Sequence, residues 1–311
     1  RRPFQGMLSG LNRFASPLDL MRVARMRFAV RKGGQAEVFK GENNRTKDYL
    51  LSRGFSNGMI ERFFHPLFSG IFLEDELRTN ERMFRFVFRM MSEGDMVLPK
   101  EGIAAAPKQL AQRLGHDRIH LNSTAQIIDD TTLSIDGKKR SFDAVVRAFN
   151  PNHEHQKRHV WTLHYAAASS PLKSKHVLLN GDVKIKNGLI AHLAVPSDIQ
   201  PSYAPRNQSL VTITVVGERA EAIGLHDATS VEAAVRIEAS QWFPEAEKNW
   251  TLLAAQHIEH ALPEIGSEVN LDQEMRVDGF ECGDHTLHGS VEGALRSAET
   301  IAQAVDTHLR G

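Results

Sequence analysis

The sequence predicts a mixed α/β fold, and three observations support this prediction. Residues 16–95 contain several helical patterns, residues 161–217 contain short β-rich runs separated by turns, and residues 282–311 pass from a short apolar strand through a turn into a helix. The chain has 311 residues, of which 41% are hydrophobic and 24% charged, so it is long enough for one large or two ordinary domains.

Helical patterns dominate the amino-terminal part. Ser16, Pro17 and Asp19 form a helix start signal, because the serine caps the helix, the proline suits its first position and the aspartate reaches back toward the cap. Residues 31–44 are largely polar, which indicates a solvated connection. A short helix is expected from Thr46.

Two further helices, rich in phenylalanine and methionine, are expected at residues 56–73 and 79–91. Their apolar positions make an unusually wide face, to which Phe84 and Phe88 contribute. One interpretation is a helix–helix core. The other is that part of this face lines a pocket for a bulky apolar substrate, because methionine and phenylalanine make adaptable apolar walls.

The middle of the chain predicts a helix after Gly102 and a small meander of strands. The strands are expected at residues 118–121, 125–129, 132–135 and 141–149. Asp136 and Gly137 form a strong hairpin signal between the last two of them. The run 141–149 is apolar enough for a buried strand.

The second half predicts an antiparallel sheet and two helices. The strands are expected at residues 177–179, 189–195 and 210–216. Thr229 and Glu232 form a capping box for a helix that reaches Trp242. The last helix is expected from Gly293, with Ala294, Ala298, Ile301, Val305 and Leu309 on one apolar stripe.

Composition excludes several classes of function. The chain has 38 basic and 38 acidic residues, so no overall field favours nucleic acid, and we expect no nucleic-acid partner. No run approaches the roughly 20 apolar residues of a transmembrane helix, although peripheral membrane contact stays open. The single cysteine, Cys282, excludes an internal disulfide and suits the reducing cytoplasm. Because the chain does not begin with methionine, targeting to an organelle also stays open.

The 15 histidines raise the question of a metal site. They are concentrated at His153, His155 and His159, in a charged segment, and at His257 and His260. No cysteine pair or His-Glu-x-x-His motif accompanies them, so no metal site is predicted.

The carboxyl-terminal segment, residues 282–295, has the character of half a dinucleotide site. Gly283 and Asp284 follow a short strand, Gly289 and Ser290 form a bend, and Gly293 stands near the start of a helix. Small residues allow close backbone approach, and a helix amino terminus favours a phosphate. The alternative is a plain strand-to-turn corner, with the glycine chosen for its backbone freedom.

Four stretches together resemble the flavin-dependent amine oxidoreductase superfamily, which includes phytoene desaturases, protoporphyrinogen oxidases and monoamine oxidases. They are residues 54–73, 98–111 and 195–205 and the segment that begins at Gly283. The first and third resemble one subgroup close to the phytoene desaturases and protoporphyrinogen oxidases.

This resemblance implies that the chain passes twice between two interleaved domains. Residues 96–151 and 266–311 would belong to an FAD/NAD(P)-binding, Rossmann-like domain. Residues 1–95 and 152–265 would form a substrate domain of helices and an antiparallel sheet.

The resemblance also implies the contacts with FAD. Gly283 and Asp284 would meet its phosphate and ribityl hydroxyls, and Ser290, Val291, Gly293 and Ala294 would lie near the pyrophosphate and isoalloxazine. Ala125 stands where the family usually has a valine at the adenine end. The family's opening G-x-G-x-x-G turn is not found, so we expect an incomplete Rossmann-like domain and a fragment that alone holds flavin poorly.

The function implied is that of an FAD-dependent oxidoreductase that removes hydride from a small molecule, and the aromatic helices favour a large apolar substrate. No catalytic residue is predicted, because the cofactor carries the hydride chemistry in such enzymes. The alternative is a non-catalytic remnant that binds a lipid-like or isoprenoid ligand without flavin. The reaction subtype, electron acceptor and oligomeric state do not follow from the sequence.

Overall fold

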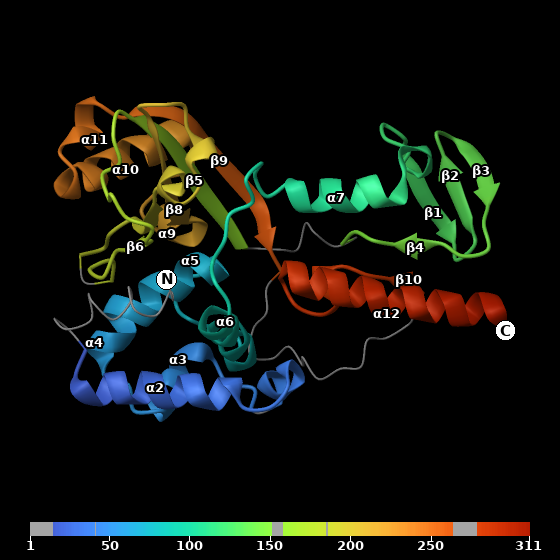
Figure 1. Cartoon of the computed structure of the whole chain (residues 1–311), viewed down its shortest axis with the longest axis horizontal. Helices are drawn as coiled ribbons and strands as arrows, with labels where there is room; N and C mark the ends of the chain where they lie inside the picture. The colour runs from blue at the N-terminus through green and yellow to red at the C-terminus, as the bar shows by residue number, and fades with distance from the viewer. Residues whose placement is uncertain (1–14, 41, 151–157, 185, 264–278) are drawn as a thin grey trace. The chain divides into compact units, whose positions relative to one another are not determined.

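The computed structural model describes residues 15–40, 42–150, 158–184, 186–263 and 279–311 (Figure 1). The chain divides into two compact units, each assembled from two separate segments. Unit 1 comprises residues 1–103 and 157–269, and unit 2 comprises residues 104–156 and 270–311. The mixed α/β class predicted from the sequence is confirmed. The assignment of one unit to FAD and the other to substrate stays a prediction.

Unit 1 begins with a group of helices. These are α2 (Pro17–Arg31), η2 (Gln35–Phe39), α3 (Thr46–Ser52), α4 (Asn57–Met59), the π-helical η3 (Ile60–Phe64), α5 (His65–Phe72) and α6 (Glu81–Glu93). The predicted capping box is present in α2, where Ser16 and Asp19 bond each other's backbone N–H groups. The predicted solvated connection is wrong in part, because η2 lies within it and buries Val38.

The aromatic residues of α5, η3 and α6 form the core of this helical group. Phe64, Phe68 and Phe84 are fully buried, and the rings of Phe68 and Phe84 lie 4.5 Å apart between centroids. Such close aromatic pairs add to the stability gained from burial alone. Because the rings pack against one another, the interpretation as a helix–helix core is confirmed for these residues.

The antiparallel sheet of unit 1 has the strand order β6-β7-β8-β5-β9. Its strands are β5 (Arg158–Ala167), β6 (Leu178–Leu179), β7 (Ile190–Ala194), β8 (Ser209–Val216) and β9 (Thr251–Leu262). The shorter helices around it are α8 (Pro196–Ile199), η6 (Pro201–Tyr203), α9 (Gly217–Ala222) and α11 (Glu245–Lys248). The long helix α10 (Ala228–Trp242) packs on one face, where Leu163, Ile213 and Val235 are completely buried.

Helix α10 is capped differently from the prediction. The Asp227 carboxylate accepts hydrogen bonds from the backbone N–H groups of Thr229 and Ser230, at 2.9 and 3.0 Å, so Asp227 is the cap and Thr229 is not. Glu232 instead accepts a hydrogen bond from Arg236 at 2.7 Å. Both residues are good caps, and the earlier one starts the helix.

Helix α5 is fastened to strand β7 by His192. Its Nε2 lies 2.8 Å from the Pro66 carbonyl and 3.0 Å from the Leu67 carbonyl, so this nitrogen carries the proton. The ring occupies the space that a side chain at residue 70 would need, which explains why Gly70 stands there. Burial lowers the pKa of His192, so the ring stays neutral.

Unit 2 contains a three-stranded antiparallel sheet and a parallel strand pair. Its elements are α7 (Ala105–Leu114), η4 (His116–Arg118), β1 (Ala125–Asp129), β2 (Thr132–Ile135), β3 (Lys138–Ser141), β4 (Val146–Arg147), β10 (Phe280–Glu281), η7 (Asp284–Thr286) and α12 (Val291–Arg310). Strand β10 pairs in parallel with β4. The predicted hairpin turn is present, since Asp136 and Gly137 both have positive φ, at 49° and 80°.

Three predictions for unit 2 are wrong. Residues 118–121 form no strand, because η4 and a loop occupy them. The hairpin partner is β3, at residues 138–141, since the two-residue turn places Lys138 opposite Ile135. The apolar run after β3 is not a buried strand, because only β4 forms within it and Phe149 is 59% exposed.

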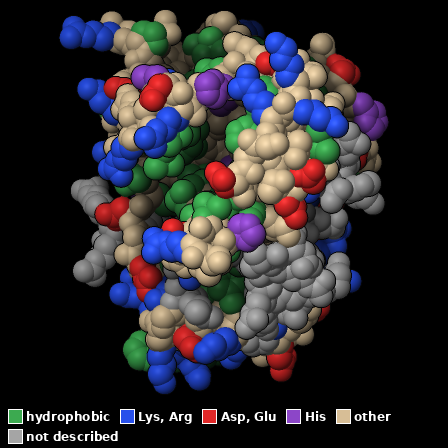
Figure 2. Space-filling view, turned by 90° about the vertical axis from the view of Figure 1, so that its right-hand side faces the viewer, with side chains coloured by type: hydrophobic (Ala, Val, Ile, Leu, Met, Phe, Trp, Pro, Cys, Tyr) green, Lys and Arg blue, Asp and Glu red, His purple; other side chains and the backbone are tan. Residues whose placement is uncertain are grey.

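Helix α12 begins two residues before the predicted start. Its buried positions are Gly293, Ser297 and Ile301, which lie one turn apart. Of the predicted apolar stripe, Ile301 is buried and Ala294 and Val305 are half-buried, whereas Ala298 is exposed and Leu309 is 55% exposed. Figure 2, which faces the side on which β3 and the end of α12 lie in Figure 1, shows apolar side chains in green among charged ones at the surface.

Candidate functional site

The predicted cofactor residues of the carboxyl-terminal segment fold into a strand–turn–helix corner. Strand β10 lies parallel to β4, with Phe280 opposite Val146 and Glu281 opposite Arg147. The N–H of Cys282 donates to the Arg147 carbonyl at 2.9 Å and continues this pairing. The chain then turns through η7 into α12, beyond the carboxyl ends of the two strands. In open α/β sheets, this edge is where ligands bind.

Ser297 of α12 holds the corner in place. Its hydroxyl accepts a hydrogen bond from the Gly283 N–H at 2.9 Å and lies 3.1 Å from the Gly283 carbonyl, to which it can donate. Ser297 is fully buried. At Gly283 φ is 150°, and a Cβ there would overlap the His285 ring, so glycine is required at this position.

The start of α12 is organised by its own turn. Ser290 is the cap residue, and its hydroxyl accepts from the Gly293 N–H at 3.0 Å. A Cβ on Gly293 would overlap the His288 carbonyl. The structure therefore explains Gly293 by the packing of this turn, with no need for a cofactor. Gly289 and Ala294 are half-buried beside it, and Val291 is 71% exposed.

Asp284 is the acidic group of the corner that is left for a ligand. Its side chain is 40% exposed, and the nearest ionic contact in the described part of the chain is His285, at 3.9 Å. By contrast, the Glu281 carboxylate lies 2.8 Å from His285 and 3.2 Å from Arg147. An exposed carboxylate beyond a strand end can accept hydrogen bonds from ligand hydroxyls.

Two other polar side chains at the corner are neutral. Burial lowers the pKa of His288, although neighbouring Glu292 partly opposes this. Burial also raises the pKa of the Cys282 thiol, which keeps it protonated and unreactive. The Cys282 side chain is buried and is not in a disulfide.

Ala125 does not join this group. It begins β1, is exposed and lies opposite Ile135 in the three-stranded sheet. Figure 1 shows that sheet beside the carboxyl-terminal half of α12, whereas residues 283–294 lie at the amino end of the helix. Only an extended ligand could contact both places.

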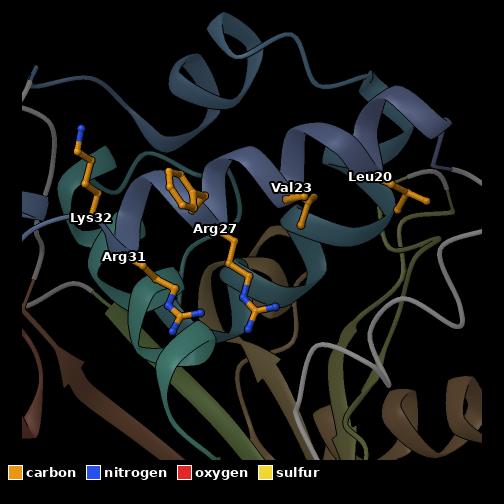
Figure 3. Close-up of a pocket in the computed structure, with 7 residues that line it drawn as sticks. Leu20, Val23, Arg27, Arg31 and Lys32 are labelled. Carbon is orange, nitrogen blue, oxygen red and sulfur yellow. The ribbon is translucent and has the colours of Figure 1, made fainter.

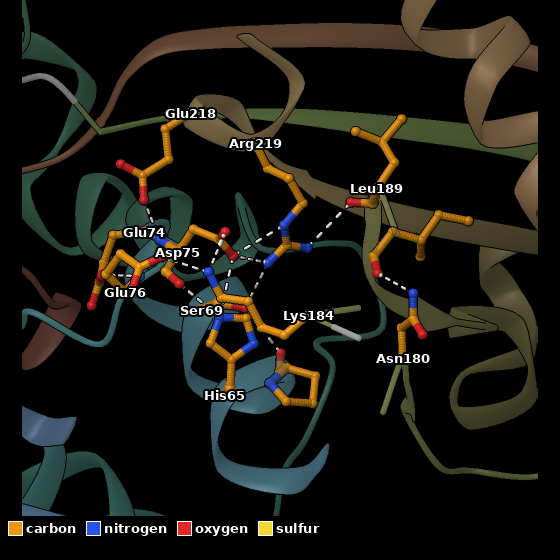
Figure 4. Close-up of polar contacts among 12 residues, drawn as sticks. His65, Ser69, Glu74, Asp75, Glu76, Asn180, Lys184, Leu189, Glu218 and Arg219 are labelled. Carbon is orange, nitrogen blue, oxygen red and sulfur yellow. Dashed lines mark hydrogen bonds and ion pairs between the residues drawn. The ribbon is translucent and has the colours of Figure 1, made fainter. Parts of the chain in front are cut away.

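Sequence reasoning missed a polar network in unit 1, which Figure 4 shows. The Asp75 carboxylate accepts from Arg219 and from Lys184, the latter at 2.9 Å, and lies 3.2 Å from His65. Burial acts to raise the pKa of Asp75, but these partners outweigh it and lower the pKa far below its usual range. Asp75 pairs with Arg219, Lys184 and His65, so the network ties α5 to α9, while the buried Nδ1 of His65 has no hydrogen-bond partner among the described residues.

The histidines assemble no metal site in the part of the chain that the structure describes. His159 lies in β5, and its Nδ1 is 2.8 Å from Nε2 of His257 in β9. His153 and His155 lie outside the described residues.

Comparison with known proteins identifies the class. The family model for flavin containing amine oxidoreductases matches residues 1–306. The chain therefore belongs to this family of flavin-dependent oxidoreductases, and the resemblance found in the sequence is confirmed. A search of curated proteins gave no match.

Solved structures show the same fold at low sequence identity. An oxidoreductase from Methanosarcina mazei is 14% identical with a TM-score of 0.68, and the match covers 93% of this chain and 73% of that one. A double mutant of putrescine oxidase is 12% identical with a TM-score of 0.62, over 94% of this chain and 76% of that one. Cyclohexylamine oxidase from Brevibacterium oxydans is 13% identical with a TM-score of 0.62, over 94% and 75%.

Within the described ranges, every helix is too short or too polar to cross a lipid bilayer.

Proposed function

We propose that the protein binds FAD at the corner between β10 and α12 and removes hydride from a large apolar small molecule. The observation that carries the proposal is the exposed carboxylate of Asp284, which stands at the corner without a hydrogen-bond partner in the described part of the chain. Family membership supports a flavin as the cofactor.

The residues at the corner fit the polar part of such a cofactor. Asp284 would accept hydrogen bonds from ribityl hydroxyls. The backbone N–H groups of Val291 and Glu292 stand in the first turn of the 20-residue helix α12, where the helix dipole favours a phosphate. The hydroxyl of Ser290 is already used as the helix cap, so it would position those groups rather than bind phosphate itself.

The flavin, once bound, would supply the hydride acceptor. The protein groups at the corner would hold it and keep the turn rigid through Ser297 and Gly283. The buried, neutral His288 would add no positive charge beneath the phosphate, so the attraction would come from backbone groups.

An apolar substrate is the finer part of the proposal. The aromatic cluster does not support it, because those rings are packed in the core. Its support is the resemblance to phytoene desaturases and the exposed apolar side chains of β9, where Leu253 is 59% and Ile258 is 46% exposed.

Uptake of FAD by Asp284→Asn is the test of this site. We expect flavin absorption after reconstitution to be stronger in a version carrying any residues encoded upstream of Arg1 than in this chain alone. We expect the variant to bind FAD about tenfold or more weakly, because a charged hydrogen bond to a ligand hydroxyl contributes roughly 1.5–3 kcal/mol. The matched control is Asp306→Asn, an exposed aspartate of α12 that pairs with Arg310. Equal affinity of both variants would exclude Asp284 from the site.

The test is run on this chain and on a version carrying any residues encoded upstream of Arg1. If both proteins are folded but stay colourless, FAD binding is excluded. That result would favour the alternative function, a module that binds an apolar ligand without flavin. The fluorescence of a lipid-like probe then decides that alternative.

A further inference from the structure

Helix α2 presents apolar side chains to solvent as well as to the core. Its inner face buries Val23, Met26 and Val30 in the core of unit 1. On its outer side, Leu18 is 54%, Met21 is 52% and Phe28 is 76% exposed. Exposed apolar residues are common singly, but three along one helix need a physical reason.

The same helix is strongly basic. Residues 17–32 contain five basic side chains and one acidic one, in a chain that is neutral overall. The basic residues are Arg22, Arg25, Arg27, Arg31 and Lys32. The acid, Asp19, is fully buried, accepts hydrogen bonds from Ser16 and Ser56 and pairs with Arg22 at 3.5 Å, so it offsets only one of the five basic charges.

The exposed apolar and basic residues share one line along the helix. Their positions are Leu18, Met21, Arg25, Phe28 and Lys32, at alternating intervals of three and four residues. Residues with this spacing lie above one another on a helix surface. The line therefore carries both apolar and cationic groups.

Two hollows lie along α2, and residues of this line are part of the lining of both. One, of about 600 Å³, is lined by residues that include Leu20, Val23, Arg31 and Lys32. Figure 3 shows Arg27 and Arg31 pointing to the same side of the helix. The other, of about 540 Å³, includes Arg25, Arg53 and Arg85 among its lining residues.

We propose that the outer surface of α2 docks on the surface of an anionic phospholipid bilayer. Arg25, Arg31 and Lys32 would meet lipid phosphate and carboxylate groups, and Phe28, Met21 and Leu18 would enter the boundary between headgroups and acyl chains. Arg25, Arg31 and Lys32 are exposed and make no ion pair with the described residues, so they are available. This proposal is independent of the proposed oxidoreductase function.

A bilayer fits this surface better than a folded partner does. Separate apolar side chains, spaced by cations along a single helix, can insert side by side into a fluid interface. A protein partner would need a matched pocket for each of them and an acid for each cation.

Sedimentation with lipid vesicles is the test. The purified protein is mixed with vesicles of phosphatidylcholine alone or with about 30% phosphatidylserine. We expect binding to the anionic vesicles only, and at least about tenfold weaker binding near 1 M salt, where charges are screened beyond about 3 Å. Equal binding to both vesicles, or to neither, would overturn the proposal.

Two variants separate charge from insertion. Arg25→Glu with Arg31→Glu should weaken binding about tenfold or more, because each basic residue near an anionic surface contributes roughly fivefold. Phe28→Ser should weaken it severalfold while leaving the salt dependence intact. The matched controls in unit 2 are Lys138→Glu with Lys139→Glu on exposed β3, and Phe149→Ser, which is 59% exposed in the native chain.

The controls should bind like the native protein, and equal losses in them would contradict a role for α2. All these positions are exposed, so the variants should fold. Their melting temperatures, compared with that of the native protein, check this expectation. If the native protein is a dimer in solution that Phe28→Ser separates, α2 is a protein interface and the lipid proposal fails. FAD uptake, measured in the same samples, reports on the proposed function separately.

Discussion

The hydroxyl of Ser297 lies between the two main-chain polar groups of Gly283, 2.9 Å from the amide nitrogen and 3.1 Å from the carbonyl oxygen. One side chain on α12 thus accepts from the Gly283 N–H and lies within reach of the Gly283 carbonyl, which also accepts from the Thr286 hydroxyl at 2.8 Å. The hydroxyl hydrogen of Ser297 can also reach the Ala294 carbonyl within the helix, at 2.9 Å. The position of Asp284, the next residue, therefore depends on a hydroxyl 13 residues further along the chain.

Replacing Ser297 by alanine should loosen the corner. A buried N–H that loses its partner costs about 1–3 kcal/mol, so we expect Ser297→Ala to lower the free energy of unfolding by that amount and to weaken FAD binding. Urea denaturation and FAD titration measure the two effects. Thr300→Ala is the control, because that exposed hydroxyl bonds only the Arg296 carbonyl in its own helix. If Thr300→Ala lowers stability as much as Ser297→Ala does, the hydrogen bond between Ser297 and Gly283 has no special role.

Adding a methyl group at Gly293 should distort the first turn of α12. The new Cβ would overlap the His288 carbonyl, and backbone atoms cannot move aside cheaply. We expect Gly293→Ala to cost about 1–3 kcal/mol of stability, measured by thermal unfolding. Gly34→Ala serves as the control, since it has an ordinary φ of −75° and open space around it. Unchanged stability of Gly293→Ala would mean that the turn relaxes.

The carboxylate of Asp19 should make stability depend on pH. Burial disfavours its charge, but hydrogen bonds from Ser56 and Ser16 outweigh burial and lower its pKa from 3.8 to about 2. A lowered native pKa gives stability that is present above pH 3.8 and lost as the pH falls through 2. The shift corresponds to about 2 kcal/mol at pH 7 and roughly half of that at pH 3.

We therefore expect Asp19→Asn to be about 2 kcal/mol less stable than the native protein at pH 7, with a smaller difference at pH 3. Denaturant titrations at the two pH values measure this. Asp306→Asn, an exposed aspartate of α12, should show no such difference at either pH. If the stability difference between Asp19→Asn and the native protein is the same at both pH values, the charge of Asp19 contributes nothing to stability.

Removing Arg219 should be far more damaging than removing an exposed arginine. Arg219 is 8% exposed and bonds Asp75, so truncation would leave a largely buried carboxylate short of a partner. We expect Arg219→Ala to cost about 3–5 kcal/mol. Arg310→Ala breaks the exposed pair with Asp306 and should cost less than about 1 kcal/mol. Chemical denaturation of both variants compares the two, and similar losses would contradict the structural role of the network.

The sequence predicted those elements whose signals are local. The capping box of Ser16 and Asp19 and the hairpin turn at Asp136 and Gly137 each need only neighbouring residues to form. The strand–turn–helix path from Gly283 was also predictable, because its glycines and small residues are consecutive.

The failures involve distant partners or competition between neighbours. Strand β9 was not predicted, because its pairing with β5 joins residues nearly a hundred positions apart and its side chains are largely exposed. Asp227, and not Thr229, is the cap residue of α10, and local patterns do not distinguish between these two neighbouring residues. The bond between Asp75 and Arg219 spans 144 positions and has no sequence signal.

For the site, the sequence indicated Asp284 but not Ser297. The available signal was a small polar residue one helical turn after Gly293, on the face that the helix buries. From the sequence alone, a serine at this position is equally consistent with a small residue that is merely tolerated there. Only the pairing with Gly283 shows what it does.

The imidazole of His192 affects the cooperativity with which unit 1 unfolds. The His192 ring fills the space beside Gly70, and its Nε2 bonds two carbonyls of α5. If α5 separated from the sheet, this buried ring nitrogen would lose its hydrogen-bond partners. Partial melting of the aromatic helices alone is thereby penalised. The helical bundle and the antiparallel sheet of this unit should consequently denature in one cooperative step.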